Sequence, residues 1–267
     1  MIDPNMPKSN VMKNDFNWEV PIENVPLPSK GVVYNPDSKL YNAEFLKIKA
    51  MTAYEEDIIS SPAYIKDGIA VHKVIESCLQ EKDINVNDLI TGDRNALMIS
   101  IRITGYGSDY KVIHNCRDCG ANNEVNVNLN ELEKNRLDEK PVVEGENLFS
   151  YKLPVTGKEV RYKFLTGHDD QEENTKQRRL QELGIVRHNS VTSFLENCIV
   201  SVDGVTDKNK ITHFIKNMPA LDSRKLRLHI KASEPGIDMK WTYCCPKCKA
   251  SNTFAIPITS EFFWPST

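Results

Sequence analysis

The apolar positions of this chain follow a helical period in some stretches and a strand-like alternation in others, and the same order of elements occurs twice. Residues 71–79 and 191–199 carry apolar side chains at helical spacing, so each is expected to form a helix with one face in a core. A second helix is expected to follow each, with Asp93 and Asp222 as the N-caps. Strand-like runs then lead into a turn that contains two cysteines.

A comparison of the chain with itself explains this recurrence. Moving the sequence by 129 positions places matching residues on one another without a gap, and offsets of 120 and 114 align the parts upstream. Self-similarity of this kind predicts one unit that is written twice. The expected fold class is therefore α+β, with each copy built from a strand or hairpin, two helices and a β-hairpin. The pairs at the 129-residue shift include Asp93 and Asp222, Leu97 and Leu226, Ile101 and Ile230, Gly107 and Gly236, and Asp109 and Asp238.

This repeat divides the chain into four expected segments. Residues 45–135 form the first copy, 136–147 a charged linker, and 148–267 the second copy with an aromatic C-terminus. Residues 1–44 contain six prolines, which rules out a long helix there. We expect an extended arm that lies on another surface, so that a chain without residues 1–40 still folds, and a disordered tail is the alternative.

Each copy contains one C-x-x-C motif between two strand-like runs. Cys116 and Cys119 lie in the first copy, and Cys245 and Cys248 lie in the second. Two thiolates at this spacing occupy one tight turn and offer two corners of a tetrahedral zinc site. The two motifs together predict a structural Zn²⁺ site with four cysteine ligands that joins the copies. Such a site is closed to water, and a catalytic zinc keeps an open position.

Other interpretations of the cysteines remain open at this stage. A redox-active C-x-x-C would need its thiol at a helix N-terminus, whereas both pairs lie between strands. Cys244 is an alternative ligand, although Cys245 has the better spacing to Cys248. The site could also form between two chains, but we prefer a site within one chain, because two copies can face each other across a pseudo-two-fold axis. Cys78 and Cys198 are expected to be small buried hydrophobic residues.

Composition excludes several classes of protein. The chain has 267 residues, 40 % hydrophobic content and a net charge of −3, with no apolar run long enough to span a membrane. Its N-terminus lacks the pattern of a secretion signal, so synthesis in a reducing cytoplasm is expected. The six histidines show no catalytic motif, and we expect neither an enzyme nor a small-molecule substrate. An acidic chain also lacks the overall basic field that nucleic-acid binding requires.

Several linked motifs in a consistent order resemble a family of baseplate proteins from contractile-tailed phages of the T-even type. The likeness covers nearly all of the chain beyond residue 25. The motifs are Leu27-Pro28-Ser29-Lys30-Gly31, Lys49-Ala50-Met51-Thr52, Gly92-Asp93-Arg94-Asn95-Ala96-Leu97, Ile103-Thr104-Gly105-Tyr106-Gly107, Val202-Asp203-Gly204, Met218-Pro219-Ala220, Asp222-Ser223-Arg224, Pro235-Gly236-Ile237-Asp238 and Phe262-Phe263-Trp264-Pro265.

This resemblance implies a non-enzymatic virion component in or near the baseplate hub, made in the host cytoplasm. Its partners would be other hub and wedge proteins or tail-tube proteins, and it would be oligomeric within the virion. Members of such a family have also been regarded as hub-assembly factors, and the sequence does not separate the two roles. A zinc-ribbon regulatory protein that binds nucleic acid is the alternative function, because cysteine knuckles on hairpins often serve that purpose.

Overall fold

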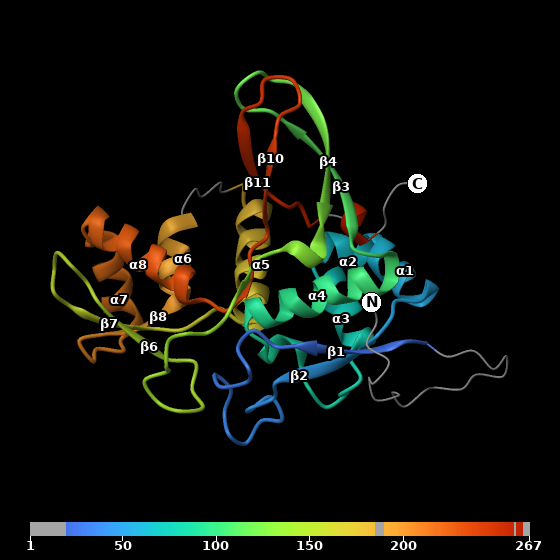
Figure 1. Cartoon of the computed structure of the whole chain (residues 1–267). Helices are drawn as coiled ribbons and strands as arrows, with labels where there is room; N and C mark the ends of the chain where they lie inside the picture. Colours follow the sequence, from blue (N-terminus) through green and yellow to red (C-terminus); the bar gives the residue numbers. More distant parts are fainter. Residues whose placement is uncertain (1–19, 185–189, 259, 264–267) are drawn as a thin grey trace.

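The computed structural model of the chain describes residues 20–184, 190–258 and 260–263. Figure 1 shows a mixed α+β fold of helices and small antiparallel sheets, as predicted. We call residues 20–135 the N-terminal half and residues 148–263 the C-terminal half. The N-terminal half contains β1 (Ile22–Pro26), β2 (Phe45–Lys49), α1 (Ala53–Ser60), α2 (Pro62–Asp67), α3 (Ala70–Cys78), the 3-10 turn η1 (Val86–Asp88), α4 (Thr91–Tyr106), β3 (Asp109–Asn115), β4 (Asn122–Asn128), the 3-10 turn η2 (Leu129–Glu131) and β5 (Lys134–Asn135).

The C-terminal half has a similar order of elements. A hairpin is followed by helices and then by a second hairpin that carries the other cysteine pair. Its elements are β6 (Phe149–Lys152), β7 (Glu159–Tyr162), α5 (Gly167–Glu182), α6 (Ser190–Cys198), β8 (Ile199–Val202), α7 (Lys208–Asn217), α8 (Ala220–Ser233), β9 (Gly236–Ile237), β10 (Lys240–Cys244), β11 (Ser251–Ala255) and α9 (Ser260–Phe263).

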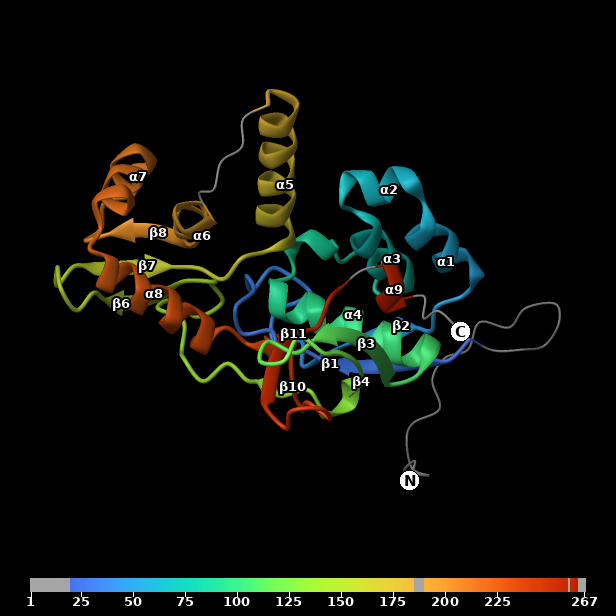
Figure 2. The ribbon, with the colours of Figure 1, turned by 90° about the horizontal axis from the view of Figure 1, so that it is seen from above.

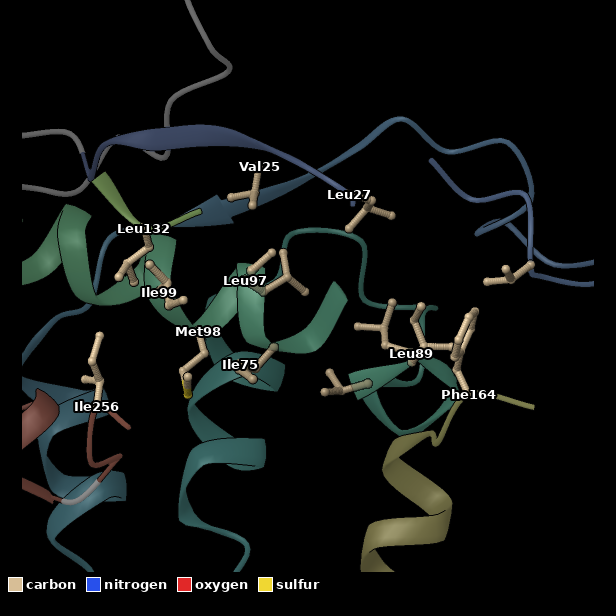
Figure 3. Close-up of a cluster of buried hydrophobic side chains, with 14 of the residues drawn as sticks. Val25, Leu27, Ile75, Leu89, Leu97, Met98, Ile99, Leu132, Phe164 and Ile256 are labelled. Carbon is tan, nitrogen blue, oxygen red and sulfur yellow. The ribbon is translucent and has the colours of Figure 1, made fainter. Parts of the chain in front are cut away.

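Helix α4 is the centre of the hydrophobic core. Leu97 and Ile99 of this helix lie under Val25 and Leu27 of the first hairpin, as Figure 3 shows. The predicted helical stripes do face the core, and the cysteines on the two packing helices, Cys78 and Cys198, are fully buried. Burial raises the pKa of each of these two thiols to about 12. Both therefore act as small apolar side chains, as expected.

The expected N-terminal arm is wrong for the residues that the structure describes. Strand β1 pairs with β2 along its whole length, and Val25, Leu27 and Leu40 are buried in the core of the same chain. The prolines fall at the strand end and in the turn after it, where a missing N–H is tolerated. Residues 20–44 are thus part of the fold, and residues 1–19 lie outside the described part of the chain.

The expected N-cap role of Asp93 and Asp222 is also wrong. Helices α4 and α8 begin earlier, after Ile90 and Pro219, and both aspartates lie in the first turn with fully buried side chains. Asp93 accepts hydrogen bonds from the Ser29 backbone N–H at 3.0 Å and from the Ser29 and Tyr34 hydroxyls at 2.5 and 2.6 Å. Each aspartate therefore fixes the turn of the preceding hairpin to its helix.

Asp222 makes the same kind of contact in the C-terminal half. Its carboxylate accepts hydrogen bonds from the backbone N–H groups of Val155 and Thr156 at 2.8 and 3.0 Å, and from the Thr156 hydroxyl at 2.9 Å. The two turns share a sequence, Leu-Pro-x-x-Gly, at residues 27–31 and 153–157. Gly31 and Gly157 end them with φ values of +73° and +67°, which favour glycine.

The helix that follows each hairpin begins with the same set of polar contacts. Thr52 is the N-cap of α1, and its backbone N–H donates to Glu55 at 2.9 Å, while Lys49 forms an ion pair with Glu55 at 2.7 Å. In the C-terminal half, Thr166 donates to Asp169 at 2.9 Å. Lys163 completes this second set through an ion pair with Asp169 at 2.6 Å.

The two halves meet along several backbone contacts. Thr91 N–H donates to the Leu165 carbonyl at 2.8 Å, and β5 pairs with β9. A Cβ atom on Gly92 would lie 1.7 Å from the Pro235 carbonyl oxygen, so only glycine permits this approach. Figure 2 shows α9 returning to the N-terminal half, where it contacts α1 and α4. There, Arg102 of α4 donates to the Phe262 carbonyl at 2.5 Å, and Phe262 and Phe263 are buried.

These two residues of the aromatic C-terminus are therefore packed within the chain, and Trp264 lies outside the described residues. Among the described helices, none combines the length and the apolar content that a membrane crossing requires.

Deleting residues 1–40 is expected to unfold the protein, in contrast to the expectation for an extended arm. The deletion removes five buried hydrophobic residues, each worth about 2 kcal/mol, and leaves the buried Asp93 carboxyl without its partners Ser29 and Tyr34. A loss of this size is comparable to the whole stability of a domain. Circular dichroism during thermal unfolding should show no cooperative transition. A cooperative transition close to that of the full chain would contradict the assignment of residues 20–40 to the core.

Glu55 is expected to make stability depend on acid pH. Burial alone would raise the pKa of this carboxyl, but Lys49, Ser77 and Thr52 lower it to about 2. A lowered pKa gives stability that is present above the unfolded value of about 4.5 and is lost as the pH falls toward 2. Between pH 5 and pH 2, the unfolding free energy of wild type should fall by about 2 to 3 kcal/mol more than that of Glu55→Gln. The exposed Glu124→Gln control should follow wild type, and equal losses in all three would refute the role of Glu55.

Candidate metal centre

Two β-hairpins, one from each half, bring the four motif cysteines together. Strands β3 and β4 form one cysteine hairpin, and β10 and β11 form the other. Figure 1 shows the two cysteine hairpins side by side at the top of the molecule. In each tip the first cysteine N–H donates to an alanine carbonyl, from Cys116 to Ala121 at 2.8 Å and from Cys245 to Ala250 at 2.9 Å. The two tips therefore have the same backbone geometry.

Both turns need a residue with positive φ directly after the second cysteine. Gly120 has a φ of +68° at the position after Cys119, and Lys249 takes a φ of +64° after Cys248. The N–H groups of Gly120 and Lys249 then donate to the carbonyls of Cys116 and Cys245 at 2.9 and 2.8 Å. These turns direct backbone N–H groups toward the sulfurs, which is the arrangement of a zinc knuckle.

The four sulfur atoms have the spacing of a metal site. Cys116 Sγ lies 3.6 Å from Cys248 Sγ, and Cys119 Sγ lies 3.8 Å from Cys245 Sγ. All four sulfurs lie within 4.8 Å of one another. Four sulfurs bound at about 2.3 Å to one metal ion would lie about 3.8 Å apart at tetrahedral angles. Disulfide bonds are far shorter, at about 2.05 Å, so the residues fit a metal and not two cross-links.

Two asparagines reach from one half to a sulfur of the other. The Asn252 side-chain amide donates to Cys116 Sγ at 3.3 Å, while its oxygen accepts from the Arg117 N–H at 3.0 Å. Asn123 approaches Cys245 Sγ at 3.8 Å in the opposite direction. Both asparagines are buried and lie 129 positions apart. Each half thus supplies a donor that stabilises a thiolate of the other half.

Aromatic side chains support the hairpins below the sulfurs. His114 stacks on Phe254 with ring centroids 4.6 Å apart, and its Nδ1 lies 3.1 Å from the Tyr243 hydroxyl. Asn123 donates to the same hydroxyl at 3.2 Å. Tyr110, at the base of the hairpin of β3 and β4, packs edge to face against Phe262, with ring centroids 5.2 Å apart. This packing fixes the separation of the two tips.

The local electrostatics favour thiolates at the first cysteine of each motif. The backbone N–H of Cys119, followed by that of Asp118, lowers the pKa of Cys116 to about 6. Backbone N–H groups of Cys248 and Lys247 lower the pKa of Cys245 in the same way. The backbone N–H of Ala250 favours the Cys248 thiolate, but burial and the other sulfurs outweigh it and raise the pKa of Cys248 to about 12. A divalent metal would supply the positive charge that allows all four to ionise.

The structure therefore brings together the four cysteines named from the sequence, all from one chain. Cys244 has an exposed side chain and does not join the cluster. The sequence interpretation missed Asn123 and Asn252, although the 129-residue shift aligns them. The cluster His168-Asp169-Asp170 is not a chemical site, because Asp169 serves the start of α5 and the exposed His168 lies 2.9 Å from Asp88.

A family model described as T4 bacteriophage base plate protein matches residues 35–264. The chain belongs to this family. Searches of curated proteins and of solved structures each gave no match. Membership confirms the resemblance that the sequence motifs indicated, and it identifies the chain as a structural baseplate protein of a contractile phage tail. The four-cysteine cluster lies wholly within the matched residues.

Asn252→Asp is expected to weaken metal binding by this baseplate protein by roughly 10- to 100-fold. The change keeps the oxygen that accepts from Arg117 but replaces the amide donor to Cys116 with a carboxylate, which repels the thiolate. Competition between the protein and a chelator for Co²⁺ measures the affinity. Asn126→Asp, an exposed position on β4, adds the same charge and should leave the affinity unchanged. Equal affinity in wild type and Asn252→Asp would show that the amide does not support the sulfurs.

Proposed function

We propose that this protein is a structural subunit of the tail baseplate, in or near the central hub, and that a zinc ion bound by Cys116, Cys119, Cys245 and Cys248 holds its two halves together. The spacing of the four sulfurs is the observation that carries the zinc proposal. Four thiolates suit zinc or iron, and the closed site leaves no position for a substrate. Family membership supports the baseplate role.

We further infer that the chain is an internal duplication. The supporting observations are paired contacts that a similar order of elements alone would not produce. Asp93 and Asp222 each hold a Leu-Pro-x-x-Gly turn, and Glu55 and Asp169 each bind a threonine and a lysine at the start of a helix. The asparagines beside the sulfurs complete the correspondence. A zinc at this place would lie near a pseudo-two-fold axis between the copies.

The zinc would act as a cross-link between distant parts of the chain. It joins Cys116 to Cys248 and so closes a loop of more than a hundred residues, which in a disulfide of similar span is worth about 5 kcal/mol. Each hairpin has only two strands, and such hairpins have marginal stability alone. The metal therefore suits a scaffold that must keep a fixed shape while neighbouring proteins bind to it.

The charges around the hairpin tips suit a site of four thiolates and a metal ion. Arg117, Lys247 and Lys249 are exposed there, with Asp118 as the acidic neighbour. Four thiolates around a divalent ion leave two negative charges, which these basic side chains offset.

We also propose that the protein is not an enzyme. A cavity of about 300 Å³ between the halves is lined by Arg94 and Asp170, which form an ion pair with each other.

Purified, untagged protein should contain one zinc per chain by mass spectrometry, and the Cys116→Ser/Cys248→Ser variant should contain none. Loss of the cross-link should also cost about 5 kcal/mol of unfolding free energy or abolish cooperative unfolding. Cys244→Ser, which removes an exposed thiol outside the cluster, is the matched control and should behave as wild type. Equal metal content in both cysteine variants would refute the site.

The assembly role is tested in the phage itself. Tails purified from phages that carry Cys116→Ser/Cys248→Ser should lack the protein or fail to form, whereas the Cys244→Ser phage should yield normal tails. Protein detected in mature tails by mass spectrometry supports a permanent subunit. Protein required for tails but missing from them supports an assembly factor instead. Normal tails without any need for the protein would contradict the proposed function.

A further inference from the structure

Helix α8 has an exposed face that combines leucines with basic side chains. Leu221 and Leu228, two turns apart on the same side of the helix, are 51 % and 53 % exposed. Arg224 and Lys225 lie between them along the chain, and Lys231 follows, all exposed. The opposite side carries the buried residues of α8, including Leu226 and Ile230. Leucines are not needed at these positions for the packing of α8 itself.

The corresponding face of α4 is covered by the protein's own chain. Gly92 and Ile99 lie 129 positions before Leu221 and Leu228, and both are buried. Gly92 contacts the backbone of Pro235, and α4 also meets the C-terminal helix α9. Helix α8 has no such cover within the described residues, yet it carries two large apolar side chains there. This difference points to a cover that another molecule provides.

The charge of this region is opposite to that of the whole chain. Residues 207–233 contain seven lysine and arginine residues but only two aspartates, in a chain of net charge −3. One of these aspartates, Asp222, is buried against the hairpin turn. Within the part of the chain that the structure describes, Arg224, Lys225 and Lys231 form no ion pair with an acidic side chain. A partner must therefore be acidic and must also carry apolar side chains that cover the leucines.

A surface with these properties exists on the same protein, in the loop at residues 141–146. Val142 and Val143 are 44 % and 45 % exposed, and the exposed Glu144 and Glu146 follow directly. The loop has a fixed shape, because Val142 N–H donates to the Leu148 carbonyl at 2.7 Å and Tyr41 donates to Glu144 at 3.2 Å. A preformed loop loses little conformational entropy on binding. The two surfaces are therefore complementary in charge and in apolar content.

The two surfaces lie on opposite sides of one molecule. Figure 1 shows α8 above the sheet formed by β6, β7 and β8, and the yellow-green loop that precedes β6 below it. We propose that the α8 face of one copy binds the loop at residues 141–146 of a second copy. This contact is heterologous, so a pair of copies keeps one free α8 face and one free loop, and successive copies form a closed ring or an open chain. The proposal concerns this surface alone and does not depend on the metal.

Sedimentation equilibrium of the metal-replete full chain tests the proposal. The average mass should rise with protein concentration, and added salt should weaken the association, because charged groups contribute to it. Leu228→Asp should weaken the association at least about tenfold, since it places a charge in the apolar centre of the contact. A protein that stays monomeric over the whole concentration range would overturn the proposal, including the case in which α8 binds a different acidic protein.

A charge exchange identifies the two surfaces. Arg224→Glu/Lys225→Glu and Glu144→Lys/Glu146→Lys should each reduce the association, and an equimolar mixture of the two variants should recover it. Lys66→Glu, an exposed lysine on α2, is the control and should leave the association unchanged. Association that resists both double variants, or no recovery in the mixture, would overturn the assignment of these surfaces. Circular dichroism of each variant confirms that the fold is retained.

Discussion

The meeting of two cysteine hairpins from distant parts of the chain is the constraint on which the arrangement of this protein depends. Each hairpin is only two strands wide, and neither has a sheet behind it. Their tips are held by four sulfurs and by the reciprocal amides of Asn123 and Asn252, and the base of the first is held by the packing of Tyr110 on Phe262. Local contacts therefore build two similar tips, and the four sulfurs lie where the tips meet.

The two halves have a similar order of elements but unequal roles in the fold. Helix α4 is buried on nearly all sides, since the hairpin of β1 and β2, the segment at Pro235 and the C-terminal helix α9 all pack on it. Helix α8 packs on one side only and presents leucines and basic side chains on the other. The N-terminal half thus provides a rigid frame, while the C-terminal half provides surface. This division suits a baseplate protein, whose work is to hold its neighbours in position.

Sequence patterns predicted the local elements well, because helical stripes and cysteine turns are set by nearby residues. The hairpin of β1 and β2 was missed because residues 27–44 separate its strands and prolines suggested an arm. The sequence did carry a sign of this hairpin, because Leu27-Pro28 and Gly31 match the turn residues Leu153-Pro154 and Gly157 of the hairpin in the C-terminal half. Asp93 was taken for a cap because its partners, Ser29 and Tyr34, are about 60 residues away. Contacts between the halves, such as the ion pair of Arg94 with Asp170, have no local signal at all.

X-ray absorption at the zinc edge, on protein purified without chelators, tests the central claim most directly. The proposed site predicts four sulfur neighbours at about 2.3 Å and no nitrogen or oxygen neighbour. Such a spectrum would show that the two hairpins bind one metal ion in a closed site with four cysteine ligands. A first shell that contains nitrogen or oxygen would mean an open or incomplete site, and protein without zinc that unfolds cooperatively would mean that packing alone joins the halves. Either result would contradict the claim that a closed zinc site holds the two hairpins together.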